Sequence, residues 1–216
     1  QMVTQIAHLG VADFRHIHDV VPWPTAPLSD LVVPLSDDKH LQSPSQMRAI
    51  KGQIGLQYTP YNEAAKYIVV LRDPKDVFIS LHHFAQGLIH DLVDVELSED
   101  MLFGAITHDQ FPICWAEHNA SWWPLRDREN VLILTFREMR RDLPALVRQV
   151  SEFMGVQLTA EQMKEVIKRC DFKYMKAHEA QFTPPWPTYR GEATVMMRKG
   201  TAGQGKTGLS AERQRI

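Results

Sequence analysis

The stretch that decides the fold is Tyr67-Ile-Val-Val-Leu-Arg-Asp-Pro-Lys-Asp-Val-Phe-Ile-Ser80. Residues 66–72 contain a continuous apolar run with three β-branched members. This pattern is typical of a strand that is buried on both faces, and it favours a parallel sheet. A helix should follow at once, because Asp73 can cap it, Pro74 suits its first position and Asp76 favours its positive end. A strand followed directly by a helix is the first half of a βαβ unit.

The rest of the chain continues this alternation of strands and helices. Residues 131–136 predict a second buried strand, and residues 142–154 predict an amphipathic helix. Thr159 and Gln162 form a capping-box pattern that opens another helix. Further helices are expected over 2–9, 97–107 and 112–123, with irregular chain over 22–48 and loops over 180–216. The fold class is therefore α/β, a single domain over residues 1–216 with a central parallel sheet flanked by helices.

Length, composition and charge exclude several classes of protein. The chain has 216 residues, of which 44% are hydrophobic and 23% charged, as in a soluble globular domain with a substantial core. No run approaches the ~20 apolar residues of a membrane span, and no secretory signal is visible. The net charge of −2 argues against a nucleic-acid partner, although a local cationic site for one small anion remains open. Cys114 and Cys170 form no disulfide framework or zinc pair, so we expect a reducing, cytoplasmic setting.

Arg72 and Ser80 are the first candidates for a ligand site. In an open parallel sheet, ligands bind beyond the carboxyl ends of the strands, and Arg72 lies at such an end. Its guanidinium can bind two phosphate oxygens at once, and Ser80, two turns into the predicted helix, can donate to the same anion. From the residues alone, the alternative is that Arg72 pairs with Asp76 while Ser80 faces solvent.

The stretch around Arg72 resembles the 3′-phosphate-binding strand and helix of the cytosolic-type sulfotransferases that use 3′-phosphoadenosine 5′-phosphosulfate (PAPS). In that family an Arg is followed by Asn or Asp, then Pro-Lys-Asp-Val and a Ser. Three further blocks resemble the family in the same order, at residues 130–142, 171–176 and 198–200. The resemblance implies a P-loop-kinase-like sulfotransferase fold. It also implies transfer of a sulfuryl group from PAPS to an alcohol or phenol, with release of PAP and without a metal.

The resemblance assigns a role to each matching residue of the nucleotide site. Those that would bind the 3′-phosphate, through charge, hydroxyl or backbone amide, are Arg72, Ser80, Arg198, Lys199 and Gly200. Phe172 would stack on the adenine, as aromatic side chains do on nucleic-acid bases. Phe136 stands where the family has a Tyr, so a hydroxyl contact to the adenine would be lost. Either ring could instead be an ordinary core aromatic.

The catalytic base is the clearest departure from the family pattern. The family has Lys-Thr-His or Lys-Ser-His ahead of the strand, and this chain has Lys51-Gly-Gln53. Lys51 would approach the bridging or sulfuryl oxygens, but Gln53 falls on the His, and an amide cannot accept a hydroxyl proton at neutral pH. His118 could serve as the base instead, although a structural role is the alternative for it. Weaker candidates are His40, His82 and His83.

Both ends of the family pattern are missing from the chain. The family's phosphosulfate loop, Pro-Lys-Ser-Gly-Thr-Thr-Trp, should lie just upstream of Val3, where only Gln1 and Met2 are present. Residues 209–213 resemble only the start of the family's last helical region. The resemblance therefore predicts that the chain is truncated, or that residues are missing, at both ends.

A second motif predicts a different enzyme. Gly200-Thr-Ala-Gly-Gln-Gly-Lys-Thr207 fits the Walker A pattern in full. A phosphate-binding loop of that class needs a strand before it, a helix after it and a later strand that bears an Asp. Only nine residues follow Thr207, so we interpret the match as a coincidence within a flexible, Gly-rich loop.

Three function hypotheses remain open at this stage. The first is a PAPS-dependent sulfotransferase with a small-molecule hydroxyl acceptor, the second a catalytically weak PAP- or PAPS-binding protein, and the third a P-loop NTPase. A homodimer is a further expectation. The sequence does not identify the acceptor, and the apolar residues that could line its pocket are Phe14, Val21, Trp23, Phe103 and Trp123.

Overall fold

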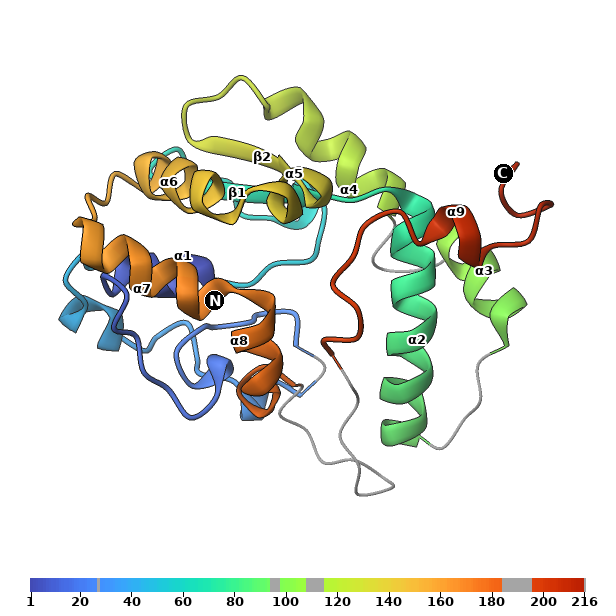
Figure 1. Cartoon of the computed structure of the whole chain (residues 1–216), viewed down its shortest axis with the longest axis horizontal. Coiled ribbons are helices and arrows are strands. Elements are labelled where there is room, and N and C mark those ends of the chain that lie inside the picture. Colours follow the sequence, from blue (N-terminus) through green and yellow to red (C-terminus); the bar gives the residue numbers. More distant parts are fainter. Residues whose placement is uncertain (27, 94–97, 108–114, 184–195, 216) are drawn as a thin grey trace. The chain divides into compact units, whose positions relative to one another are not determined.

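The computed structural model describes residues 1–26, 28–93, 98–107, 115–183 and 196–215 (Figure 1). The chain divides into two compact units. Unit 1 comprises Gln1–Gly52, Asp142–Trp186 and Val195–Arg198, and unit 2 comprises Gln53–Arg141, Pro187–Thr194 and Lys199–Ile216. The single sulfotransferase domain expected over residues 1–216 stays a prediction.

Each predicted helix and strand has a counterpart within a few residues. The strands are β1 (Tyr67–Leu71) and β2 (Val131–Thr135), and the helices are α1 (Met2–Ala7), α2 (Pro74–Val93), α3 (Glu99–Thr107), α4 (Trp115–Trp122), α5 (Phe136–Arg141), α6 (Leu143–Met154), α7 (Ala160–Cys170), α8 (Phe172–Ala177) and α9 (Gly205–Gly208). The sequence does not predict helices α5 and α8. The short α9 interrupts the region expected to be loops.

Unit 2 is built on a parallel pair of strands, as predicted. Strands β1 and β2 pair in register, with Leu71 opposite Thr135. Val69 and Val131 are buried together with Trp122 of α4. The expectation that β1 is buried on both faces is wrong for this chain, since a neighbouring residue of the strand, Val70, is 43% exposed. Successive side chains of a strand point to opposite faces, so the face that carries Val70 is less covered than the face that carries Val69.

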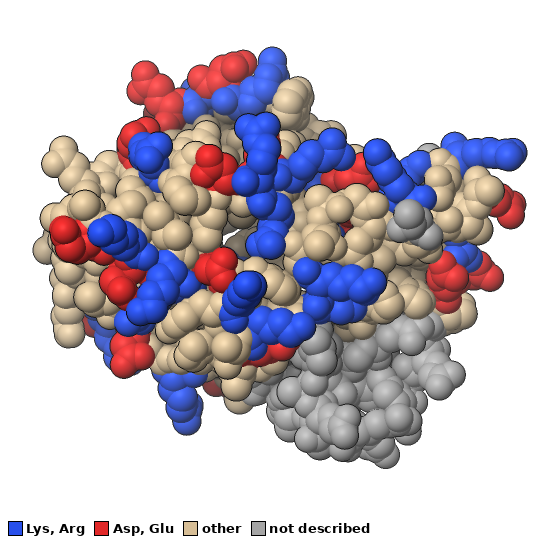
Figure 2. All heavy atoms as spheres, in the orientation of Figure 1, with Lys and Arg blue, Asp and Glu red and all other residues tan. Residues whose placement is uncertain are grey.

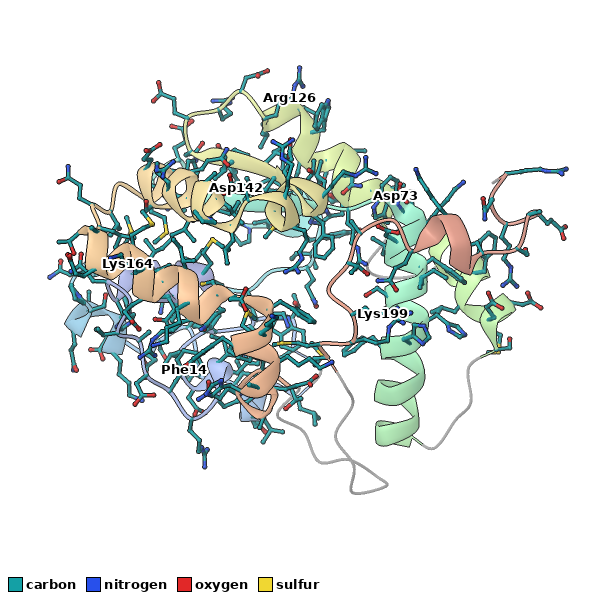
Figure 3. The ribbon with its side chains drawn as sticks, in the orientation of Figure 1. Phe14, Asp73, Arg126, Asp142, Lys164 and Lys199 are labelled. Carbon is teal, nitrogen blue, oxygen red and sulfur yellow. The ribbon has the colours of Figure 1, made fainter. Side chains whose placement is uncertain are left out.

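Helix α2 begins where the sequence predicted. Asp73 (Figure 3) caps it, because Oδ1 of Asp73 accepts hydrogen bonds from the backbone amides of Lys75 (2.9 Å) and Asp76 (3.3 Å). Pro74 is the first helical residue. On the buried side of the first turns lie Asp76 and Phe78, and Phe78 belongs to a cluster that also holds residues of α3 and of the chain after α9.

Unit 1 has a small helical core made by α1, α6 and α7, which pack against one another. Ile6, Val147 and Val166, one from each helix, are fully buried. The helix predicted over 142–154 and the Thr159–Gln162 capping box are confirmed, within one residue for α6. Asp142 caps α6 through the amide of Ala145, Gly155 ends it with a left-handed φ of 77°, and both halves of the Thr159–Gln162 capping box are present.

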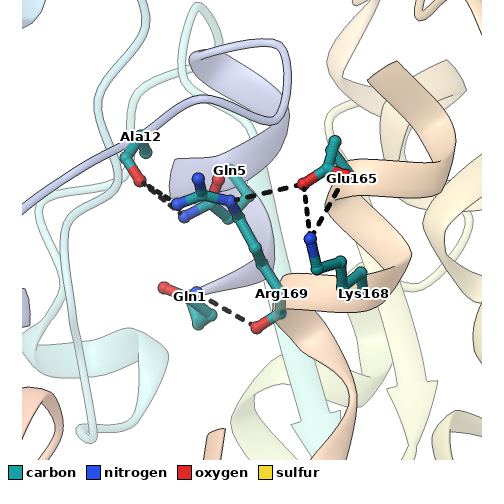
Figure 4. Close-up of polar contacts among 6 residues, drawn as sticks. All are labelled: Gln1, Gln5, Ala12, Glu165, Lys168 and Arg169. Atoms are coloured by element: carbon teal, nitrogen blue, oxygen red, sulfur yellow. Dashed lines mark hydrogen bonds and ion pairs between the residues drawn. The ribbon is translucent and has the colours of Figure 1, made fainter. Parts of the chain in front are cut away.

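Polar contacts fix the turn after α1 against α7 (Figure 4). The Ala12 carbonyl accepts hydrogen bonds from Arg169 Nη1 (2.9 Å) and Gln5 Nε2 (3.0 Å), and Gln1 Nε2 donates to the Arg169 carbonyl (3.2 Å). Gly10 makes the turn possible, since its φ is +86° and a Cβ there would lie 3.1 Å from atoms of α7. The start of the irregular chain after α1 is therefore attached to α7.

Candidate functional site

Arg72 and Phe136 lie together at one end of the sheet in unit 2. Each follows its strand directly, and the parallel register delivers both to the same edge. The guanidinium carbon of Arg72 lies 4.5 Å from the centroid of the Phe136 ring, which is a cation–π contact. The indole Nε1 of Trp115 in α4 donates to the Arg72 carbonyl at 2.8 Å. The cation is therefore held where a parallel sheet binds ligands.

Ser80 lies on the second turn of α2, four residues after Asp76. Residues four apart lie on the same face of a helix, so Ser80 and Asp76 share one side of α2. Ser80 is half-buried and Asp76 is 4% exposed.

The Walker-type sequence, residues 200–207, surrounds a carboxylate of the protein itself. The two oxygens of Asp76 accept hydrogen bonds from the backbone amides of Gly203 and Gly205, each at 2.7 Å. The helix that follows, α9, has only four residues and packs against α2. The described residues just before the motif, 196–199, form no strand. These observations support our interpretation of the motif as a coincidence.

Lys51 in unit 1 lies on the face of an aromatic ring. Its Nζ is 3.4 Å from the centroid of the Trp23 ring, and its backbone amide donates to the Pro22 carbonyl at 2.8 Å. The ring of buried His18 stacks on Trp23 at 5.2 Å, and Nδ1 of His18 is 3.1 Å from the Val21 carbonyl. Burial lowers the pKa of Lys51 to about 8, from the ordinary 10.5. Sequence reasoning missed His18, because no motif or spacing links it to Lys51.

The lowered pKa of Lys51 predicts how stability depends on pH. Between about pH 8 and 10.5 the unfolded chain binds more protons than the folded chain, so the free energy of unfolding should rise with pH over this range. Urea unfolding of wild type and Lys51→Met should be compared from pH 7.5 to about 9.5. The advantage of wild type over the variant should grow with pH. Lys164→Met, at an exposed position of α7, should show no such trend, and a flat difference for Lys51→Met would contradict the prediction.

Phe172 and Arg198 belong to neighbouring segments of unit 1. Phe172 is the first residue of α8. Near the end of that helix, Lys176 Nζ donates to the Arg198 carbonyl at 3.3 Å, and Glu179 Oε1 accepts from the backbone amide of Met197 at 2.7 Å. The structure therefore connects two segments with predicted roles. Helix α8 carries Phe172, which is predicted to stack on the adenine, and the other segment carries Arg198, which is predicted to bind the 3′-phosphate.

Gln53 and His118, the two main candidates for the base position, lie in connected segments of unit 2. Gln53 is half-buried and His118 lies in α4, where its Nδ1 is 3.3 Å from Asn119 Oδ1. Ser121 of α4 accepts a hydrogen bond from the amide of Leu56 at 2.9 Å, so α4 is attached three residues after Gln53. The weaker candidates lie elsewhere, with His40 in a 3-10 turn at Lys39–Gln42 and His82 and His83 on α2.

Three further features bear on expectations from the sequence: metal ligands, membrane-spanning helices and the two cysteines. Among residues 1–26, 28–93, 98–107, 115–183 and 196–215, no group of three or more His, Cys, Asp or Glu could hold a metal ion. No helix in that part of the chain has the length and apolar character needed to cross a membrane. Cys170 is a buried free thiol, and burial raises its pKa to about 11. Cys114 lies outside the described residues.

Acidic and basic side chains are interspersed on the face drawn in Figure 2. Exposed ion pairs such as Lys168 with Glu165 at 3.4 Å contribute little to stability.

Comparisons with known proteins place these features in context. Residues 11–215 match a protein family described as "Sulfotransferase domain". Luciferin sulfotransferase of Photinus pyralis is 35% identical over 125 residues, which cover 55% of this chain and 31% of the relative. Sulfotransferase 1C2 of Homo sapiens is 26% identical over 200 residues, covering 90% of this chain and 65% of the relative. The chain therefore spans less than two thirds of the length of these curated relatives.

Solved structures show the same fold. Retinol dehydratase in complex with androsterone and the inactive cofactor PAP superposes with a TM-score of 0.68 at 22% identity, covering 85% of this chain and 52% of the other. Mouse sulfotransferase SULT7A1 complexed with PAP gives a TM-score of 0.65 at 19% identity, covering 93% and 72%. The α/β class with a parallel sheet flanked by helices is thereby confirmed.

Proposed function

Because this chain belongs to the sulfotransferase family, we propose that it transfers a sulfuryl group from PAPS to a small hydroxyl-bearing acceptor and releases PAP. The observation that carries the proposal is Arg72, held at the carboxyl end of β1 by Phe136 and Trp115. A guanidinium fixed in this place suits a phosphate group, which it can bind with two parallel hydrogen bonds.

The proposed nucleotide site draws on the residues expected from the sequence. In unit 2, Arg72, the Ser80 hydroxyl, Lys199 and the Gly200 amide bind the 3′-phosphate. Phe136, also in unit 2, takes the position that the family resemblance assigns near the adenine. In unit 1, the resemblance assigns Phe172 to stacking on the adenine and Arg198 to the 3′-phosphate. The hydrogen bond from Lys176 to Arg198 supports this assignment within unit 1, because it holds α8 against the Arg198 segment.

The proposed reaction is an in-line displacement at sulfur. The acceptor oxygen forms a bond to sulfur while the bond from sulfur to the phosphate oxygen breaks, and PAP departs with the negative charge. Lys51, positioned on the Trp23 ring, neutralises charge on the sulfuryl or bridging oxygens, since positioning and electrostatic stabilisation dominate such transfers. The hydroxyl proton passes to another base, for which His118 is the main candidate, because the Gln53 amide cannot accept it.

The names of the relatives suggest the class of acceptor. They include a luciferin sulfotransferase and a 3-alpha-hydroxysteroid sulfotransferase, and one neighbouring structure contains androsterone. We propose a small alcohol or phenol as the acceptor and the cytoplasm as the setting. A homodimer remains a prediction.

Thermal unfolding with nucleotides tests the proposal. PAP carries the 3′-phosphate that Arg72 and Ser80 would bind, and ATP lacks it. PAP at ~100 times its dissociation constant should add about 2.7 kcal/mol to the free energy of unfolding, and ATP at the same concentration much less. Equal stabilisation by both nucleotides would refute a 3′-phosphate site and would favour a P-loop NTPase.

A PAP- or PAPS-binding protein with weak catalysis is the second candidate, and it is favoured by Gln53 at the base position. Incubation with labelled PAPS and a panel of phenols and alcohols separates the two candidates. Turnover of any acceptor supports the enzyme, whereas tight PAP binding without turnover supports the binding protein.

A further inference from the structure

Asp76 is a buried carboxylate whose partners come from a distant part of the chain. It is 4% exposed, and its two oxygens accept hydrogen bonds from the amides of Gly203 and Gly205, 127 and 129 residues later. Buried carboxylates are stable only when such partners are present, and hydrogen bonds to a charged acceptor are stronger than neutral ones. This contact therefore fixes the Gly-rich segment against the first turn of α2.

The glycines of the segment are adapted to this contact. Gly203 has a φ of +87°, which favours glycine. A Cβ at Gly205 would lie 2.4 Å from Cβ of Lys75 and 2.8 Å from its carbonyl carbon, so the close approach of the two backbones requires glycine there. Helix α9 then continues beside α2 (Figure 1).

The same contact sets the position of the proposed phosphate-binding residues. Gly200 lies three residues before Gly203, so it is within about 11 Å of that anchor even if the chain is fully extended. Ser80 lies one turn beyond Asp76 on the same face of α2, a rise of about 6 Å. By fixing Gly203, Asp76 therefore keeps Lys199 and Gly200 close to the face of α2 that carries Ser80. Lys199 is labelled in Figure 3.

We propose that Asp76 is a positioning residue for the 3′-phosphate site: by occupying the amides of Gly203 and Gly205, it fixes the Lys199–Gly200 segment against α2 so that these residues can bind the phosphate. The inference rests on the proposed function, because it assumes a nucleotide with a 3′-phosphate. Asp76 itself touches no ligand, and the amides it fills are closed to the phosphates of ATP.

The test compares the affinities of PAP and AMP by calorimetry, since AMP lacks the 3′-phosphate. Asp76→Asn places an NH₂ group against a backbone amide and removes the charge, so PAP binding should weaken by about tenfold or more. AMP binding should change little. Asp142→Asn is the matched control, because Asp142 also accepts a backbone amide, from Ala145 at 2.9 Å, but caps α6 in unit 1. It should leave the ratio of the two affinities unchanged.

Gly205→Ala disrupts the same contact from the other side. It should lower the PAP-to-AMP ratio as Asp76→Asn does, and the double variant should lose no more than the worse single variant, because both changes break one interaction. Melting curves without nucleotide show whether each variant is folded. If Asp76→Asn is unfolded, the ratio of PAP to AMP affinity in Gly205→Ala alone tests the inference.

The outcomes separate the inference from the proposed function. If the wild-type chain binds PAP no more tightly than AMP, the proposed function fails. If wild type prefers PAP and folded Asp76→Asn or Gly205→Ala keeps that preference, only the positioning role is overturned. An equal loss of PAP and AMP binding would also overturn it, because a general structural defect moves both affinities together.

Discussion

Replacing Gln53 with His should raise the rate of sulfuryl transfer by about 10²–10⁴-fold, the usual contribution of a positioned general base. The affinity for PAP should change little, because Gln53 is not among the proposed nucleotide residues. The new imidazole would accept the proton of the acceptor hydroxyl, which the Gln53 amide cannot do. The rate with labelled PAPS and a phenol acceptor, measured with and without the substitution, gives the result directly.

A pH profile and two further variants make the Gln53 test specific. In Gln53→His the rate should fall as the pH drops below about 6.5, where imidazole becomes protonated. Gln53→Ala is the matched control and should give no gain. If the rate stays flat in Gln53→His while His118→Ala abolishes transfer, then His118 is the base and the alignment of Gln53 is wrong. His18, which stacks on Trp23 beside Lys51, should be tested in the same way.

Arg72→Ala should weaken PAP binding by about 10–150-fold, because a hydrogen-bonded contact between ions is worth roughly 1.5–3 kcal/mol. Lys206→Ala should have little effect, although Lys206 would be essential in a Walker-type site. Arg126→Ala is a matched control within unit 2, because Arg126 also lies over an aromatic ring, that of Trp123, at 5.2 Å. If Lys206→Ala weakens nucleotide binding more than Arg72→Ala does, the P-loop NTPase becomes the better hypothesis.

The sequence predicted those helices, strands and caps that depend on interactions between residues close together in the chain. The β1–α2 junction, the amphipathic helix over 142–154 and the Thr159–Gln162 capping box all depend on residues a few positions apart. Hydrophobic periodicity and capping preferences report on such short distances. Helices α5 and α8 are only six residues long, so they show too little periodicity to be recognised.

Contacts between distant segments could not be predicted in this way. The approach of Lys51 to Trp23 and His18 depends on how irregular chain folds back, and no residue pattern encodes it. The partners of Asp76 were also missed, since its place in the first turn suggested a favourable interaction with the helix dipole and, as an alternative, an ion pair with Arg72. In the folded chain that carboxylate is instead the acceptor for amides more than 120 residues away.

The carboxylate of Asp76 acts as a tethered competitor for the Gly203 and Gly205 amides. A group joined to its site by the chain has an effective concentration in the millimolar range or above, and it never diffuses away. A free nucleotide would have to outcompete this permanent occupant and also leave a buried carboxylate without its partners. Whether a glycine-rich segment binds phosphate thus depends on whether the fold already places an internal anion against its amides. A match to the glycine pattern cannot show this, because it does not include the residue that competes with the phosphate.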